Sequence, residues 1–368
     1  MSKERGKEVK PKKIKLKKKD RFAEVKKAMV PTYIAPDFLS KKYGIKQVFD
    51  SGIFMLKNQI SNKFYSVKCK DNMDKQGVFD VLRSYDFGYR FYYFDNKTYL
   101  LIQINSDEKQ DASFDFDVIE KELFKKLAGL GVTLDALNLE DRLRFIHQYI
   151  VKDKPDSNNN IMDYVHNVIA WKADFELDGI QEYMNGLKIG DKEYYFFYFN
   201  RFGNNTTEML QELSKIEGVE SIMVEHNGIS DGALYEFFHN NFMGCDNELR
   251  KLKKLNNSLY EILTDPTMRD SRSYSMVGIN VLYAVSSQDA DTVKEKIQFI
   301  VDRYDASIFY FCGEMASAFV DFSPLGEWKN SELRLVKNSE SCNCMLFNEG
   351  NASDVGDSEL NKFFMGGM

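Results

Sequence analysis

Apolar residues along the chain follow two spacings, one typical of strands and one typical of amphipathic helices. The apolar residues of Ser51–Lys70, on either side of Asn58, predict a hairpin that turns near Asn58. Arg90–Phe94 and Thr98–Ile104 flank a turn and predict a second hairpin. Between them, Asp74–Ser84 carries apolar residues three and four positions apart, which predicts a helix. The first part of the chain should therefore alternate short strands with helices.

Two more helices follow in this half of the chain. Phe116–Leu130 has one apolar stripe, and we expect Gly129 and Gly131 to end that helix. Asn138 is suited to cap a second helix that runs to about Val151. Asp153–Asn160 contains proline and consecutive asparagines, so it predicts a loop that joins two subdomains.

The second half repeats one order, strand then helix then strand, in two passes separated by a long helical stretch at Ala233–Leu263. Two such passes favour a split β-α-β arrangement of the ferredoxin-like kind. The predicted strands of the passes are Tyr194–Arg201, Val219–His226, Met276–Ser286 and Ala306–Phe311, and the predicted helices are Thr207–Ile216 and Asp289–Tyr304. Two later segments, Phe319–Leu325 and Glu332–Phe347, are predicted to be further strands.

These elements predict an α+β fold, with mixed or antiparallel sheets, ferredoxin-like β-α-β passes and flanking helices. The predicted divisions are a basic arm (1–30), a first α+β subdomain (31–155), a second α+β subdomain with the split passes (156–350) and a tail (351–368). The chain has 29 Phe and 20 Tyr, and they run consecutively in strands such as Tyr194–Phe199. Consecutive aromatic residues indicate strands covered on both faces, so we expect a core and not a base-stacking platform.

Charge is distributed unevenly. Residues 1–27 carry 13 Lys or Arg and 4 acids, a net of +9, whereas the whole chain is −6 and the remainder is therefore −15. Such an arm could contact an anionic membrane surface, nucleic-acid phosphates or an acidic protein, or it could serve only as a solubilising tail. The candidate contact residues are Lys12, Lys13, Lys15, Lys17, Lys18 and Lys19. Since the body is acidic, nucleic acid is the less favoured partner.

Motifs for catalysis are missing from the sequence. The one Gly-Lys pair, Gly6-Lys7, is followed by Glu8, so no phosphate loop for a nucleotide is present. The four histidines have no metal-ligand spacing, although His226 and His239 are close enough in sequence to approach one another. Cys342 and Cys344 are interpreted as alternating strand residues, not as zinc ligands, and Asp321 as a turn cap. We therefore expect no enzymatic activity, no cofactor and no metal.

The order of several short motifs resembles the amino-terminal half of the type IV secretion and conjugative transfer ATPases, the TraE/TrbE/CagE group. Tyr43-Gly44-Ile45 and Asp50-Ser51-Gly52-Ile53 resemble the family's opening, and Phe64-Tyr65-Ser66-Val67 resembles its second strand. The run from Leu134 through Asn138 to Arg142-Leu143 resembles a conserved helix start, and Pro324-Leu325-Gly326 resembles a late turn.

That resemblance implies a role without ATP hydrolysis, because family members carry the phosphate loop in a following motor domain and this chain has none. What it implies is a non-catalytic assembly or docking module of a conjugative transfer apparatus. Its partners would be inner-membrane channel proteins or a separately encoded motor domain, and it would form a homo-oligomer. It would lie in the cytoplasm, peripheral to the inner face of the cell membrane. The alternatives are a nucleic-acid-binding accessory protein that uses the basic arm, or a truncated fragment of a full ATPase.

Overall fold

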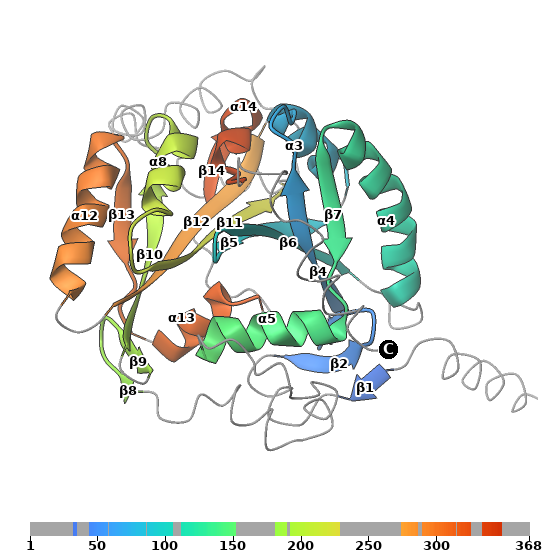
Figure 1. Cartoon of the computed structure of the whole chain (residues 1–368), viewed down its shortest axis with the longest axis horizontal. Helices are drawn as coiled ribbons and strands as arrows, with labels where there is room; N and C mark the ends of the chain where they lie inside the picture. Colours follow the sequence, from blue (N-terminus) through green and yellow to red (C-terminus); the bar gives the residue numbers. More distant parts are fainter. Residues whose placement is uncertain are drawn as a thin grey trace, which may run out of the picture.

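The computed structural model gives an α+β fold built on a 14-stranded sheet in which every pairing is antiparallel. Helices cover both faces of the sheet (Figure 1). The structure describes residues 32–34, 44–57, 59–85, 87–105, 112–151, 181–189, 192–228, 274–285, 289–313, 315–324 and 333–347. None of the described helices has the length and apolar character needed to cross a bilayer.

The first nine described elements after the edge strand β1 (Thr32–Ile34) form what we call the first repeat. They are β2 (Ile45–Phe49), β3 (Phe54–Leu56), β4 (Ile60–Cys69), α3 (Lys75–Arg83), β5 (Gly88–Phe94), β6 (Lys97–Asn105), α4 (Ala112–Gly129), β7 (Val132–Ala136) and α5 (Leu139–Val151). Local sequence explains the boundaries: the Asp74 side chain accepts a hydrogen bond from Gly77 N at 2.9 Å and caps α3. The β5–β6 turn uses Asp95 and Asn96, both at positive φ, as a two-residue hairpin requires.

The next nine described elements form the second repeat. They are β8 (Gln181–Glu182), β9 (Leu187–Ile189), β10 (Lys192–Arg201), α8 (Thr206–Leu213), β11 (Val219–Asn227), β12 (Tyr274–Val285), α12 (Ala290–Arg303), β13 (Ser307–Tyr310) and α13 (Met315–Phe322). Three short elements end the described chain: β14 (Arg334–Lys337), α14 (Asn338–Ser341) and the 3₁₀ helix η3 (Cys342–Cys344). Of these, β14 pairs with the first residues of β12.

The two repeats share one topology. In the first, the strands lie in the order β7-β4-β6-β5, and in the second they lie in the order β13-β10-β12-β11. Each order is that of a ferredoxin-like β-α-β-β-α-β unit, with two short strands before it and a helix after it. The chain is therefore a structural duplication.

One antiparallel pairing joins the repeats into a single sheet. The strand β5 of the first repeat pairs with β11, its counterpart in the second, in a register that sets Arg90 opposite Glu225 and Tyr89 opposite His226. Because equivalent strands run antiparallel to one another, an approximate two-fold axis passes through this seam. We call this pairing the seam.

Two buried clusters lie on opposite faces of the sheet. Figure 1 shows α12, α8, α3 and α4 in an arc over one face, whereas α5 and α13 lie along the other. The first cluster includes Phe79, Leu123 and Ile297 from the arc helices, and the second includes Leu143 and Phe319. The strands between them are buried on both faces, so the interpretation of the consecutive aromatic residues as core is confirmed.

The structure confirms both predicted hairpins, the helices of the first half and every strand and helix of the two later passes, within a few residues at each end. The two passes belong to one unit, because β10, β11, β12 and β13 pair in one sheet. The sequence patterns did not indicate that residues 60–136 repeat the same unit. The predicted stretches Asp153–Asn160 and Ala233–Leu263 lie outside the described residues.

Two predicted strands are wrong. Phe319–Leu325 overlaps α13, where Met315, Ala318, Phe319 and Phe322 are buried on one face. That is helical spacing, but a short apolar run does not by itself distinguish a helix from a strand. In Glu332–Phe347 only Arg334–Lys337 is a strand, because the chain then turns through α14 and η3.

Candidate functional site

A group of buried, hydrogen-bonded polar side chains lies at the seam. The Arg90 guanidinium donates from Nε and Nη2 to Oε2 of Glu225, at 2.8 and 2.5 Å, and the two side chains are 0% and 3% exposed. The other carboxylate oxygen accepts from Nδ2 of Asn227 at 2.6 Å. A charged pair this deep is tolerated because nearly every lone pair and proton has a partner.

The same seam holds the end of α13. Four consecutive carbonyls, from Asp321 to Pro324, accept hydrogen bonds from first-repeat side chains. In order, the donors are Arg90 Nη1 at 2.9 Å, Tyr149 OH at 3.0 Å, Tyr92 OH at 3.2 Å and Arg142 Nη2 at 3.3 Å. Cations at a helix C-terminus satisfy its free carbonyls and oppose the negative end of the dipole.

Burial fixes the protonation of the two tyrosines in this group. Desolvation raises the pKa of Tyr92 and raises that of Tyr149 well above its usual range. Since the Tyr149 proton goes to the Phe322 carbonyl, the hydrogen bond of 3.0 Å with Ser221 is donated by the serine hydroxyl. Both phenols are therefore neutral donors that hold main chain.

Arg142 of α5 is the second buried cation. Its guanidinium donates to the carbonyls of Gly52 and Asn62, at 2.8 and 3.1 Å, and to Oδ1 of Asn62 at 2.6 Å. The guanidinium carbon lies 3.6 Å from the centroid of the Phe54 ring. Burial without a carboxylate among these acceptors lowers the pKa of Arg142 to about 9.

Arg142 brings together three motifs that are far apart in the sequence. It contacts Gly52 from the Asp50–Ile53 motif and Pro324 from the late turn, and it lies itself in the helix-start motif. Gly52 has a φ of +77°, and a Cβ there would lie 2.0 Å from the Leu137 carbonyl, so only glycine fits. Asn138 caps α5, as predicted, by accepting from Asp141 N at 2.8 Å. We call Arg90, Tyr92, Arg142, Tyr149 and Glu225, with the carbonyls that they bind, the junction.

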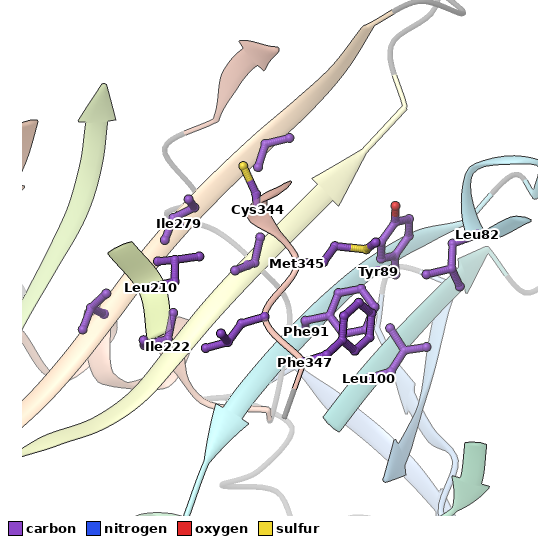
Figure 2. Packing of buried hydrophobic residues seen from close by; sticks show 14 of the residues in the cluster. Leu82, Tyr89, Phe91, Leu100, Leu210, Ile222, Ile279, Cys344, Met345 and Phe347 are labelled. Atoms are coloured by element: carbon purple, nitrogen blue, oxygen red, sulfur yellow. The ribbon is translucent and has the colours of Figure 1, made fainter. Parts of the chain in front are cut away.

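A segment that we call the C-terminal clasp, residues 342–347, covers the opposite face of the seam. Figure 2 shows Met345 and Phe347 between Leu210 of the second repeat and Leu82 of the first. The Phe347 ring packs edge-on to Phe91 at 5.2 Å between centroids, and the Leu346 carbonyl accepts from Thr98 at 3.3 Å. The clasp therefore joins the repeats on one face as the junction does on the other.

Beneath α3, beside the clasp, lies His226. Its ring stacks on Tyr89 at 5.1 Å and contacts Phe79, and neither ring nitrogen has a hydrogen-bond partner. Full burial lowers the pKa of His226 to about 3. It is a neutral core side chain, and His239, its predicted neighbour, lies outside the described residues.

The remaining candidate residues separate into described and undescribed groups. Cys342 and Cys344 lie in η3, not in a strand, and burial raises the pKa of Cys344 to about 12. Asp321 lies in the last turn of α13, not in a separate turn. The six lysines of the basic arm, Lys12, Lys13, Lys15, Lys17, Lys18 and Lys19, lie outside the described residues. Within the described ranges, no three His, Cys, Asp or Glu side chains gather closely enough to hold a metal ion.

An open cleft of about 730 Å³ lies where β10 leads into α8, beside β14. Its charged lining is of both signs: Arg201, Arg334, Lys337, Glu208, Asp305 and Glu340. Arg201 is already paired with Asp305 at 2.9 Å. This mixed lining selects no single class of ligand.

Comparison with known proteins adds little to this geometry. No family model matches the chain, and no curated protein matches it. Among solved structures it is similar to a chitooligosaccharide oxidase (9% identity, 67% of this chain, 44% of that one, TM-score 0.28) and to a Physcomitrella patens BBE-like 1 protein (11% identity, 67% and 44%, TM-score 0.27). An unknown protein from Galdieria sulphuraria gives 10% identity, 69% and 98% coverage and a TM-score of 0.20. TM-scores this low carry no argument about fold or function, and the chain spans less than half of the first two proteins.

Proposed function

We propose that the chain is a non-catalytic assembly and docking module of a conjugative transfer, or type IV secretion, apparatus. The observation that carries the proposal is the convergence on Arg142 of three motifs that resemble the amino-terminal half of the transfer ATPases. Each motif has a physical task at that point: a glycine turn, a capped helix with a buried cation, and a carbonyl at the end of α13. Their joint presence is what a shared fold would require.

The buried polar side chains of the junction are hydrogen-bonded within the protein, which supports a binding role over a catalytic one. The polar atoms of Arg90, Glu225 and Tyr149 are hydrogen-bonded to other side chains or to main chain, and so are both terminal nitrogens of Arg142. Groups held in this way stabilise a rigid body. Such a body presents its outer surface and its basic arm to partners, which we propose are inner-membrane channel proteins or a separately encoded motor domain.

The proposal is tested by deleting the gene from its host and measuring the frequency of conjugative transfer. We expect transfer to be lost while growth is unchanged, and to return with the wild-type gene. Complementation by Arg142→Leu should fail, whereas Arg144→Leu should succeed, because Arg144 forms only a part-exposed pair with Glu140. Transfer at the normal frequency in the deletion strain would contradict the proposal.

The alternative, a nucleic-acid-binding accessory protein, would also act through the basic arm, and the two roles of the arm can be told apart. We expect the full chain to float with vesicles that contain anionic lipid and not with neutral ones. Changing the six candidate lysines to glutamine should abolish flotation, since each cation near an anionic surface contributes about 1 kcal/mol. Tight binding to duplex DNA that weakens steeply with salt, without vesicle binding, would favour the alternative.

A further inference from the structure

The outer edge strands of the two repeats, β7 and β13, differ in charge at equivalent positions. Asp135 on β7 lies opposite Ser66 on β4, and Phe309 on β13 lies opposite Tyr198 on β10. By strand order and face, Asp135 and Phe309 occupy equivalent positions. The first repeat thus has a carboxylate, paired with Lys68 at 2.8 Å, where the second has a phenylalanine that is 53% exposed.

A charge on an edge strand is a common protection against pairing with another chain. Within the described residues β13 pairs only with β10, and its four residues Ser307–Tyr310 carry no charge and no proline. More exposed apolar surface adjoins it. Gly313, just after β13, donates its N–H to the Met184 carbonyl, and Met184 and Tyr183 are 77% and 46% exposed. Within the part of the chain that the structure describes, the outer edge of β13 is therefore apolar and has no charge or proline of its own to protect it.

We propose that β13 is a self-association edge, at which a second copy of this chain adds its own β13 in antiparallel pairing. The seam gives a precedent for such pairing. There the two repeats, which share one topology, already join their sheets through the edge strands β5 and β11. In an antiparallel pair, directly opposite side chains lie on the same face of the sheet. When a strand pairs with its own copy, the two-fold axis must therefore pass at a residue and not between two residues.

Centring the pair on Phe309 sets the two Phe309 rings opposite one another across the two-fold axis. Ile308 then faces Tyr310 of the second copy, and no charge lies opposite a like charge along the strand. A cross-strand aromatic pair of this kind stabilises a sheet beyond the area it buries. Self-association at β13 deepens the docking function, and its role in the cell rests on that proposed function. The geometry of the pairing rests on β13 alone.

The test is sedimentation velocity of the full chain over a range of concentrations. We expect a dimer, and we expect Phe309→Lys to weaken it roughly 100-fold, because like charges would then lie opposite one another. The matched control is Phe299→Lys, a 67% exposed phenylalanine on the solvent side of α12 that lies off the edge strand. The control should dimerise like the wild type.

A second measurement fixes the register. In a Cys312→Ser background, Phe309→Cys should form an intermolecular disulfide under mild oxidation, whereas Phe299→Cys should not. A chain that is monomeric at every concentration, or a dimer that Phe309→Lys leaves intact, would overturn the inference. A monomeric chain whose deletion still abolishes transfer would overturn this inference and leave the docking function standing.

Discussion

Replacing Arg90 by methionine should destabilise the fold far more than the same change in an exposed ion pair. Arg90 supplies both hydrogen bonds to Oε2 of Glu225 and one to the Asp321 carbonyl, and its side chain is 0% exposed. Without it, a carboxylate that is 3% exposed keeps only the hydrogen bond from Asn227 among those described above. The Asp321 carbonyl at the end of α13 loses its Arg90 donor as well.

The magnitude follows from these losses. Removing one partner of a buried ion pair costs about 3–5 kcal/mol, chiefly because the other charge stays buried and uncompensated. The lost carbonyl donor adds about 1 kcal/mol. The control is Lys68→Met, which removes a surface pair with Asp135 whose side chains are 73% and 52% exposed. Exposed pairs of this kind contribute only about 0–1 kcal/mol.

The assay is urea unfolding followed by circular dichroism for four proteins: wild type, Arg90→Met, Glu225→Gln and the double variant. The double variant should be more stable than the sum of the single changes predicts, by roughly 2 kcal/mol or more, because each single change leaves a buried charge without its countercharge. A loss of less than about 1 kcal/mol for Arg90→Met, or one equal to that of Lys68→Met, would refute the reasoning about the junction.

Three further predictions concern single buried positions. Because the pKa of His226 is lowered to about 3 in the fold, only the unfolded chain gains a proton below pH 6.5, so stability should fall as pH drops toward 4, by up to roughly 3 kcal/mol. His226→Phe should remove that component from thermal melts taken between pH 8 and pH 4. Gly52→Ala should cost about 3 kcal/mol or more in urea unfolding, since its Cβ would overlap the Leu137 carbonyl at positive φ. Asn280→Leu should raise the free energy of unfolding by about 1 kcal/mol, measured by urea unfolding, because neither amide atom of this 1% exposed side chain has a partner.

Local chemistry explains the part of the fold that was predictable. The Asp74 cap sets the start of α3, and Asp95-Asn96 sets the β5–β6 turn, and each acts within a few residues of itself. In α13 no cap or turn residue distinguished helix from strand, so the short apolar run was assigned to the wrong element. A short element can be assigned from its own residues only when they include a helix cap or a turn residue.

The duplication could not be predicted from the sequence. The two repeats share the order of their strands and helices, but equivalent positions do not carry the same residues. Asp135 and Phe309 occupy equivalent positions with opposite chemistry. The junction is equally non-local, since Arg90 and Glu225 lie 135 residues apart. One signal was present: a charge lies in each of two predicted strands, Arg90 in Arg90–Phe94 and Glu225 in Val219–His226. Such charges require a partner, and the two together indicate a buried pair.

Calorimetric titration of the purified full chain with Mg-ATP tests most directly the claim that this chain binds partners without nucleotide chemistry. We expect no saturable heat, because the buried cations of the junction are engaged with Glu225 and with the carbonyls of α13. Tight, saturable binding of Mg-ATP would contradict the account.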